Sequence, residues 1–391
     1  MDNLKKIAPY WLLLFTIGFG WFILAPLVPG LIKTFGITLP SAILLISVYG
    51  FAMIVLGLLA GWISAKFTVK AALYSAAAIT FVGLLGRALS QTYAELLAFQ
   101  LLAAIAYPLA MAPVGTVSES LFKKKSHTII GMSVGVLFLG MAAGAMIGPS
   151  IFAAFGLSGA FDITVLLSVV ALACILRGIK DYPVNYKGKS LKGTFKVGML
   201  RNWYVGAAIA MASVMFGSIA STMLILNKLP FGTAIADAGL FGGLAFLGSA
   251  VGAMLLPTLF ERYGKIRAGL IATSLLSFIF IFITARYLSF NPIVPLLALS
   301  YFLLGMFGNA YWSMAMASTV EYVDDPAKAG FATSMYSVAT NIGVAVLPIF
   351  LGPLFTTKPH FAIGIVSAIE FVAFLLSFTL FVKVARGRKR G

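Results

Sequence analysis

The sequence predicts an all-α membrane protein with twelve transmembrane helices arranged as two pseudo-symmetric six-helix bundles. Three observations predict this fold class: the apolar composition, a regular series of apolar runs, and a one-sided distribution of Lys and Arg. Of the 391 residues, 61% are hydrophobic and 10% are charged, whereas soluble domains are about 45–50% apolar and about 25% charged. Twelve spans of about 20 residues need roughly 240 residues, which leaves short connections and no room for a large soluble domain.

The twelve apolar runs follow one another with short polar breaks. In chain order they cover residues 9–32, 39–62, 71–90, 93–118, 129–155, 161–179, 203–227, 238–260, 268–288, 292–318, 331–355 and 361–383. The first run is longer than the apolar core of a cleaved signal peptide, so we expect it to remain as a span. Pro26, Pro29, Pro108 and Pro113 lie in the first and fourth runs, where proline can break a helix and free backbone carbonyls.

Glycines on the fifth and eighth runs recur at the spacing of one helix face. They are Gly140, Gly144 and Gly148 on the fifth run, and Gly239, Gly243, Gly248 and Gly252 on the eighth. Stripes of small residues let membrane helices approach closely. We therefore expect each of these two helices to pack tightly against a neighbour.

The positive charges predict the orientation. With the N-terminus inside, 23 of the 28 Lys and Arg residues fall in cytoplasmic segments, and the other five are Lys33, Arg87, Lys228, Arg286 and Lys358. Cytoplasmic loops of membrane proteins have such an excess of Lys and Arg. We therefore predict a multi-pass protein of the cell membrane with both termini in the cytoplasm. The net charge of +17 then reflects topology, and we expect no nucleic-acid partner.

A Lys-rich segment near the midpoint and an internal repeat divide the chain. We expect an N-terminal six-helix bundle at 1–179, a cytoplasmic basic linker at 180–202, and a C-terminal bundle with a basic tail at 203–391. Gly148-Pro149 on the fifth run is repeated as Gly352-Pro353 on the eleventh, and Glu119 after the fourth run as Glu321 after the tenth. Two halves of like orientation form the parallel repeat of one class of transporter.

A loop motif carries a family resemblance. The segment Glu261-Arg262-Tyr263-Gly264-Lys265, between the eighth and ninth runs, resembles the loop signature of the major facilitator superfamily. In the first-half copy, Ala65 replaces the acid and Thr68 replaces the glycine. The resemblance implies a secondary transporter whose halves rock about a central site. It places the first, fourth, seventh and tenth spans around the cavity, the fifth beside the eighth, and the twelfth at the periphery.

The same loop is a candidate gate. A tight turn between helices needs a glycine such as Gly264, and Glu261 can pair with Arg262 or with a helix end. We expect Glu261, Arg262, Gly264 and Lys265 to form a gating loop that holds one state closed. The alternative is a basic loop that only sets the topology.

Catalytic chemistry is not expected. His127 and His360 lie in loops, and no ligand spacing for a metal occurs. The segment Gly188-Lys189-Ser190 lacks the earlier glycine of a phosphate-binding loop, because Pro183 stands there. We therefore predict no enzyme activity, no catalytic residue, no cofactor and no metal.

Amide, hydroxyl and aromatic side chains near the middle of the spans are the candidates for the substrate cavity. They are Trp21, Gln100, Tyr107, Ser218, Thr222, Asn309, Tyr311, Trp312, Tyr336 and Asn341. Such groups hydrogen-bond and stack a neutral solute, and the alternative for each is an interhelical hydrogen bond or packing. We interpret Arg87 and Arg286 as anchors at the ends of spans, which disfavours a strongly anionic substrate.

Three carboxylates are candidates for proton coupling. Glu370 lies near the middle of the twelfth run, and Glu95 and Asp237 lie near the outer ends of the fourth and eighth. A carboxylate inside a membrane is costly and marks a functional candidate, although capping of a helix end is the alternative for Glu95 and Asp237. The favoured function is proton-linked transport of a small neutral or weakly charged organic solute by a monomer. Export of hydrophobic compounds, and a non-transporting receptor or scaffold, are the alternatives.

Overall fold

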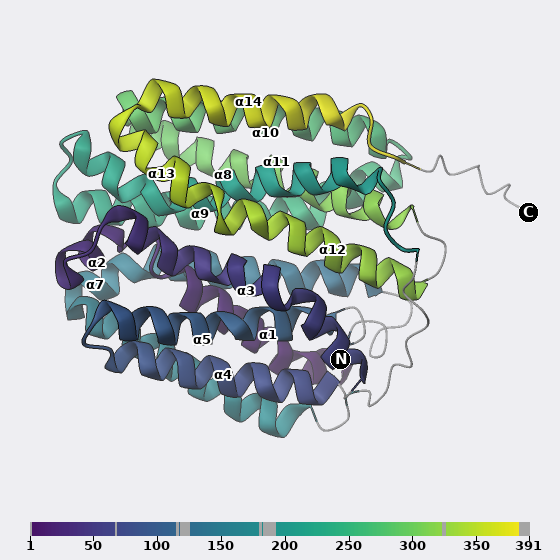
Figure 1. Ribbon diagram of the computed structural model, residues 1–391, viewed down its shortest axis with the longest axis horizontal. Helices are drawn as coiled ribbons and strands as arrows, with labels where there is room; N and C mark the ends of the chain where they lie inside the picture. Colours follow the sequence, from purple (N-terminus) through teal and green to yellow (C-terminus); the bar gives the residue numbers. More distant parts are fainter. Residues whose placement is uncertain are drawn as a thin grey trace, which may run out of the picture.

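The computed structural model describes residues 2–66, 69–114, 117, 126–179, 182, 193–322 and 326–382. In this part of the chain, all regular structure is helical, and the helices lie side by side along the long axis of the molecule (Figure 1). The helices are α1 (Asp2–Phe22), α2 (Val28–Phe35), α3 (Leu39–Lys66), α4 (Val69–Leu89), α5 (Tyr93–Met111), α7 (Ser126–Gly178), α8 (Met199–Leu226), α9 (Phe231–Arg262), α10 (Ile266–Phe290), α11 (Val294–Val320), α12 (Pro326–Ala345), α13 (Leu347–Thr357) and α14 (Pro359–Ser377).

The buried apolar side chains form two core clusters. The first cluster comes mainly from α1 to α7, and the second mainly from α8 to α14. In Figure 1 the green and yellow helices of the second cluster lie above the purple and blue helices of the first. This division agrees with two halves, but the boundaries 1–179, 180–202 and 203–391 stay a prediction. Much of the expected linker lies outside the described residues, as does Glu119.

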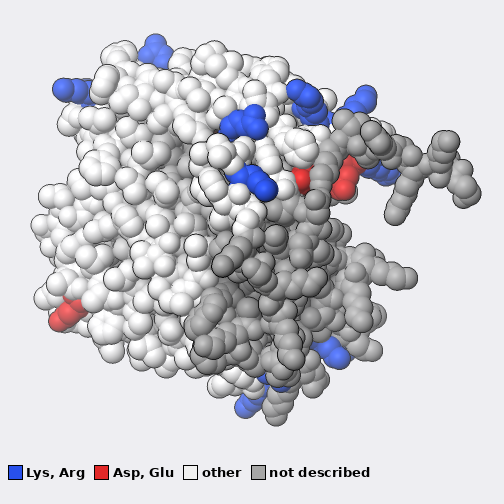
Figure 2. Space-filling model, turned by 45° about the vertical axis from the view of Figure 1, so that its right-hand side comes forward, with Lys and Arg blue, Asp and Glu red and all other residues white. Residues whose placement is uncertain are grey.

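The two ends of the bundle differ in their charge. The end where α1 begins and α14 ends is called the basal face below, and the end that holds α2 is called the distal face (Figure 1). Figure 2 turns the basal side forward and shows Lys and Arg side chains around its rim. Arg262, Lys265 and Arg267 in the α9–α10 connection are exposed there. The expected orientation makes the basal face cytoplasmic, and this stays a prediction.

The helix α7 is a hairpin that contains the predicted fifth and sixth spans. Gly156 has a φ of +68° and a ψ of −166°, which interrupts the helix. Before it, Gly140 packs on Phe15 and Gly144 on Phe19, so this arm runs parallel to α1. After it, the order along α1 is reversed, because Gly178 packs on Pro9 near the start of α1. The chain therefore turns back at Gly156 without a loop.

Two predicted spans are broken in the structure. The run 9–32 is divided into α1 and α2, and the run 331–355 into α12 and α13. Pro29 and Pro348 occupy the first turns of α2 and α13, where a missing backbone N–H costs nothing. Pro26 lies in the break between α1 and α2, whereas Pro29 lies within α2 and α5 continues through Pro108.

Within the described residues, ten helical stretches are long and apolar enough to cross a membrane. The stretch Met132–Gly178 includes both arms of α7, and α1 is not among the ten. The fold is therefore that of a multi-pass membrane protein, while the count of twelve spans stays a prediction. The count of ten stretches differs from the twelve expected spans for two reasons. The helix α1 is not counted, and the two arms of α7 on either side of Gly156 are counted as one stretch.

Glycines set the contact between the two clusters. A Cβ added at Gly239 of α9 would collide with the Ala145 carbonyl oxygen and with Pro149 on the first arm of α7. On the other side of the bundle, Gly50 of α3 packs against Val344 and the backbone of Ala345 in α12. The expected neighbourhood of the fifth and eighth spans is confirmed, because these glycines place α7 directly against α9.

Candidate functional site

An aromatic stack lies inside the first cluster at mid-depth. Trp21 of α1 stacks on Tyr49 of α3, with ring centroids 4.5 Å apart and planes 7° apart. Tyr107 of α5 tilts against Trp21 at 5.3 Å. The Trp21 Nε1 donates a hydrogen bond of 2.8 Å to the Ile46 carbonyl oxygen of α3. The polar end of the indole is therefore satisfied by protein, and its buried ring packs against Tyr49 and Tyr107.

Arg87 does not anchor the end of its helix in solvent, as expected from the sequence, but is fully buried. Its Nη1 donates to the Gly20 carbonyl oxygen at 2.7 Å and to Gln100 Oε1 at 3.0 Å, and its Nη2 donates to Thr164 Oγ1 at 2.7 Å. The guanidinium also lies 5.1 Å from the centre of the Phe161 ring. No acidic side chain pairs with Arg87 within the described residues, and its Nε has no hydrogen-bond partner there.

Close packing of α4 on α5 explains why Arg87 is buried near the end of a helix. Gly83 packs against the backbone of Ala103, and Gly86 packs against the Phe99 ring. These two glycines, placed just before Arg87, bring α5 over the arginine. In the sequence, the signal for a buried Arg87 was a pair of glycines three residues apart beside it. The sequence pattern alone did not reveal which helix they would contact.

The Gln100 side chain connects Arg87 with α3 through two hydrogen bonds. Its Oε1 accepts from Arg87, and its Nε2 donates to the Leu45 carbonyl oxygen at 2.9 Å. Gln100 and Trp21 thus bind the adjacent carbonyls of Leu45 and Ile46. One turn further along α3, Gly50 contacts Val344 and Ala345 of α12. Gln100 is an interhelical connector in this structure, with both ends of its amide already bonded.

The second cluster presents its own polar and aromatic group. The Tyr336 hydroxyl of α12 donates to the Trp312 carbonyl oxygen of α11 at 2.9 Å, and the two rings meet edge to face at 5.3 Å. Asn341 of α12 donates from Nδ2 to the Ser337 carbonyl oxygen at 2.8 Å. Its buried Oδ1 has no hydrogen-bond partner within the described residues.

Tyr107 and Asn341 join the two groups across the halves. The Tyr107 side chain lies close enough to that of Asn341 to interact with it electrostatically. Asn341 Oδ1 nevertheless makes no hydrogen bond of ordinary geometry. An unsatisfied amide oxygen between two aromatic groups is able to accept a hydrogen bond from a small solute. This juxtaposition defines the central site named here, which consists of Trp21, Tyr49, Tyr107 and Asn341.

Four other candidates from the sequence are not part of this central site: three are already hydrogen-bonded, and Thr222 is not bonded to any described residue. Asn309 donates from Nδ2 to Ser249 Oγ at 2.7 Å, and the Ser218 hydroxyl donates to the Val214 carbonyl oxygen of its own helix. The Tyr311 hydroxyl donates to the Ala373 carbonyl oxygen of α14, away from the first cluster. Thr222 is half-buried, and its Oγ1 has no partner in the described part of the chain.

The three candidate carboxylates have different surroundings. Glu95 is exposed and closes a capping box, because its Oε2 accepts from the backbone nitrogens of Gln91 and Thr92 at 2.8 and 3.1 Å. This geometry is the capping alternative expected for Glu95. Asp237, in the second turn of α9, is half-buried.

Glu370 of α14 is buried, with 2% of its surface exposed. Its Oε1 has no hydrogen-bond partner among the described residues. The Tyr204 hydroxyl of α8 and the Tyr311 hydroxyl of α11 donate to the Ile369 and Ala373 carbonyl oxygens, on either side of the glutamate. Although α14 is the last helix, Glu370 therefore faces the second cluster.

The candidate gating loop forms the expected turn. Gly264 has a φ of +64°, and the backbone nitrogens of Gly264 and Lys265 donate to the carbonyl oxygens of Glu261 and Phe260 at 2.9 and 2.8 Å. Glu261, Arg262 and Lys265 are exposed. Glu261 makes no ion pair with a described residue, and Thr68 of the first-half copy lies outside the described residues. The gating role stays a prediction.

Comparisons with known proteins identify the family and the fold. The sequence matches the Major Facilitator Superfamily over residues 10–285 and again over residues 204–391. The structure is similar to the crystal structure of a mutant of the nucleoside transporter NupG. The TM-score is 0.73 and the identity 15%, with 97% of this chain and 100% of that chain covered. At this identity the similarity shows the fold alone.

No curated protein matches the sequence. The family match covers more than half of the chain, and the fold, the apolar helices and the paired core clusters are those of a membrane carrier. The chain therefore belongs to the Major Facilitator Superfamily and is a multi-pass membrane transporter of a small solute.

Proposed function

We propose that this chain moves a small neutral or weakly charged organic solute by proton-linked alternating access, and that the solute binds at the central site. The observation that supports the proposal is the stack of Trp21, Tyr49 and Tyr107 facing Asn341 across the two halves. Flat or amphipathic solutes stack on aromatic rings, and the unpartnered amide oxygen provides one acceptor. A nucleoside, the solute named for NupG, is one member of this class.

Contacts between the halves extend from the middle of the bundle to the distal face. The rings of Phe22 in α1 and Phe246 in α9 meet at 4.2 Å, and Gly217 of α8 lies against Phe22. Nearer the distal face, Ile43 of α3 and Ile219 of α8 converge on Gly352 of α13. Alternating access requires such contacts to separate when the solute reaches the opposite side.

The experiment is flux into proteoliposomes, with a panel of radiolabelled neutral solutes that includes nucleosides and amino acids. Uptake is measured with and without a pH gradient. Accumulation of one solute that depends on the gradient supports the proposal. Uptake of lipophilic cations alone would support export of hydrophobic compounds instead, and no flux of any solute would contradict transport at this site.

Matched substitutions of two tyrosines test whether the solute binds at the central site. Tyr107→Phe and Tyr311→Phe each remove one hydroxyl, but only Tyr107 faces Asn341 across the halves. We expect Tyr107→Phe to raise KM severalfold for the transported solute and Tyr311→Phe to leave KM unchanged. Equal effects of the two substitutions on KM would place the solute elsewhere.

A further inference from the structure

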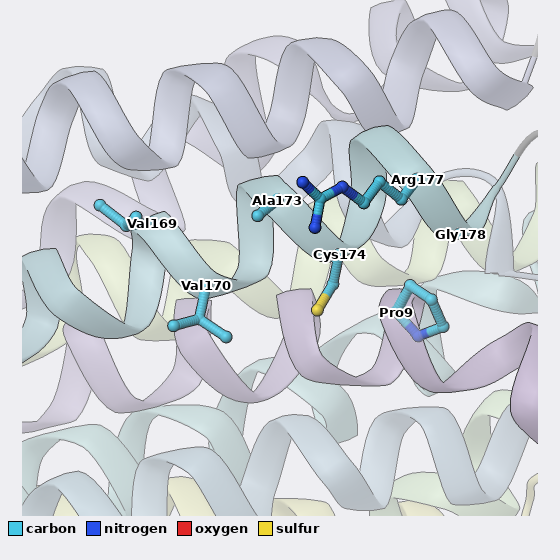
Figure 3. A pocket seen from close by; sticks show the side chains of 7 residues that line it. All are labelled: Pro9, Val169, Val170, Ala173, Cys174, Arg177 and Gly178. Carbon is cyan, nitrogen blue, oxygen red and sulfur yellow. The ribbon is translucent and has the colours of Figure 1, made fainter.

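An apolar groove lies on the outside of the first cluster, between the start of α1 and the end of the second arm of α7. Its volume is about 530 Å³. Figure 3 shows Val170 on one turn of α7 and Ala173 and Cys174 on the next, above the helix α1 that holds Pro9. Gly178 closes one end of the groove, because its missing side chain lets α7 touch the Pro9 ring. The lining residues Val169, Val170 and Ala173 are exposed, so in a membrane the groove faces lipid.

Positive charge is concentrated at the basal end of this groove. Among the described residues that line it, Arg177 is the charged one. Arg177 is exposed and makes no hydrogen bond or ion pair with the described part of the chain. Lys5 and Lys6 are exposed on α1, one turn from Pro9. The Tyr182 hydroxyl donates to the Lys6 carbonyl oxygen at 2.7 Å, which holds the start of α1 beside the end of α7.

We propose that this groove binds one anionic phospholipid, with an acyl chain along Val170, Ala173 and Cys174 and the phosphate at Arg177, Lys5 and Lys6. Basic pockets between membrane helices hold acidic lipid headgroups, because the cations meet the phosphate at the interface while the chain fills the apolar part. A zwitterionic lipid fits the groove less well, since its own cation repels the three basic side chains. The site is separate from the central site and does not depend on the transported solute.

Native mass spectrometry of the purified full-length protein tests this proposal. The delipidated protein is titrated with phosphatidylglycerol or with phosphatidylcholine of the same acyl chains. We expect one phosphatidylglycerol molecule to remain bound at collision energies that remove phosphatidylcholine. Equal retention of the two lipids would overturn the proposal.

Three variants locate the lipid. Arg177→Gln should weaken phosphatidylglycerol binding at least tenfold, and Val170→Trp should exclude the lipid by filling the groove. Arg286→Gln is the matched control, because Arg286 is an exposed arginine at the distal end of α10, where it lies over the Phe290 ring. Binding that is unchanged in Arg177→Gln would overturn the proposal. Because Arg177 is exposed, its variant should melt at the wild-type temperature without lipid, which excludes misfolding as the cause.

Discussion

Arg87 is a cation buried among four helices with only neutral partners in the described structure. Its two terminal nitrogens reach acceptors on α1, α5 and the second arm of α7. A charge removed from water without a counter-charge is costly, so its hydrogen bonds must offset much of this cost. The planar guanidinium suits this task, because its donors point in fixed and divergent directions.

We expect Arg87→Lys to destabilise the protein. A lysine keeps the charge, but its single nitrogen cannot reach Gly20, Gln100 and Thr164 together. Each lost hydrogen bond to a charged group should cost about 1.5–3 kcal/mol. Thermal unfolding in detergent measures the effect, with Arg286→Lys as the exposed control, for which we expect a change within about 0.5 kcal/mol. A wild-type melting temperature for Arg87→Lys would contradict the network.

Among the described carboxylates, Glu370 is the one that protein surrounds most completely. We expect Glu370→Gln to keep folding and solute exchange but to lose accumulation driven by a pH gradient, because glutamine preserves the shape and cannot titrate. Proteoliposome uptake with an imposed gradient measures this. Glu95→Gln is the control, since the Glu95 carboxylate caps a helix at the surface. If Glu370→Gln accumulates solute normally, Glu370 does not couple protons.

At the scale of helices, glycine positions decide how closely the halves meet. Gly239 and Gly242 lie one turn apart on α9, and both face Ala145 of α7. An added Cβ at Gly239 meets backbone and the Pro149 ring, whereas one at Gly242 meets the Ala145 Cβ at 3.4 Å, an ordinary contact. A glycine-to-alanine substitution at each of the two positions therefore separates the effect of close packing, which is present at Gly239, from the effect of helix propensity, which is present at both.

We expect Gly239→Ala to lower the transport rate and the melting temperature, because α7 and α9 must move apart. Gly242→Ala should leave transport unchanged and gain up to about 1 kcal/mol in helix propensity. Flux and melting measurements on the same preparations test both. A Gly239→Ala protein indistinguishable from Gly242→Ala would mean that this contact is loose.

The fold was predictable to the level of helices because each helix needs a long apolar run. The tight α7–α9 contact was also predictable, from the glycine spacing and the family resemblance. The breaks after Phe22 and at Val346 were harder to predict, since proline marks a break in α1 but is accommodated within α5. Side-chain partners were not predictable: Gln100 was a cavity candidate with an interhelical hydrogen bond as the alternative, and its amide connects Arg87 with α3.

At the scale of the whole molecule, the orientation remains to be tested. We expect the basal face, with the exposed Lys265, to be cytoplasmic and the exposed Lys358 between α13 and α14 to be outside. Lys265→Cys and Lys358→Cys, each with Cys174→Ser, are labelled with an impermeant maleimide. Lys358→Cys should react in intact cells and Lys265→Cys only after permeabilisation. The reverse labelling pattern would show that the predicted orientation is wrong and that the basal face lies outside.

The buried arginine also bears on how the chain enters the membrane. In an isolated α4, the Arg87 guanidinium in the last turn would lack all three of its partners on other helices. Gln100, its partner on the next helix, follows after a connection of only three residues between Leu89 and Tyr93. Because α4 and α5 leave the ribosome consecutively, the hydrogen bond can form within one helical hairpin during insertion. Gly20 of α1 has by then already been synthesised, whereas Thr164 arrives later, so the arginine acquires its partners in the order of translation.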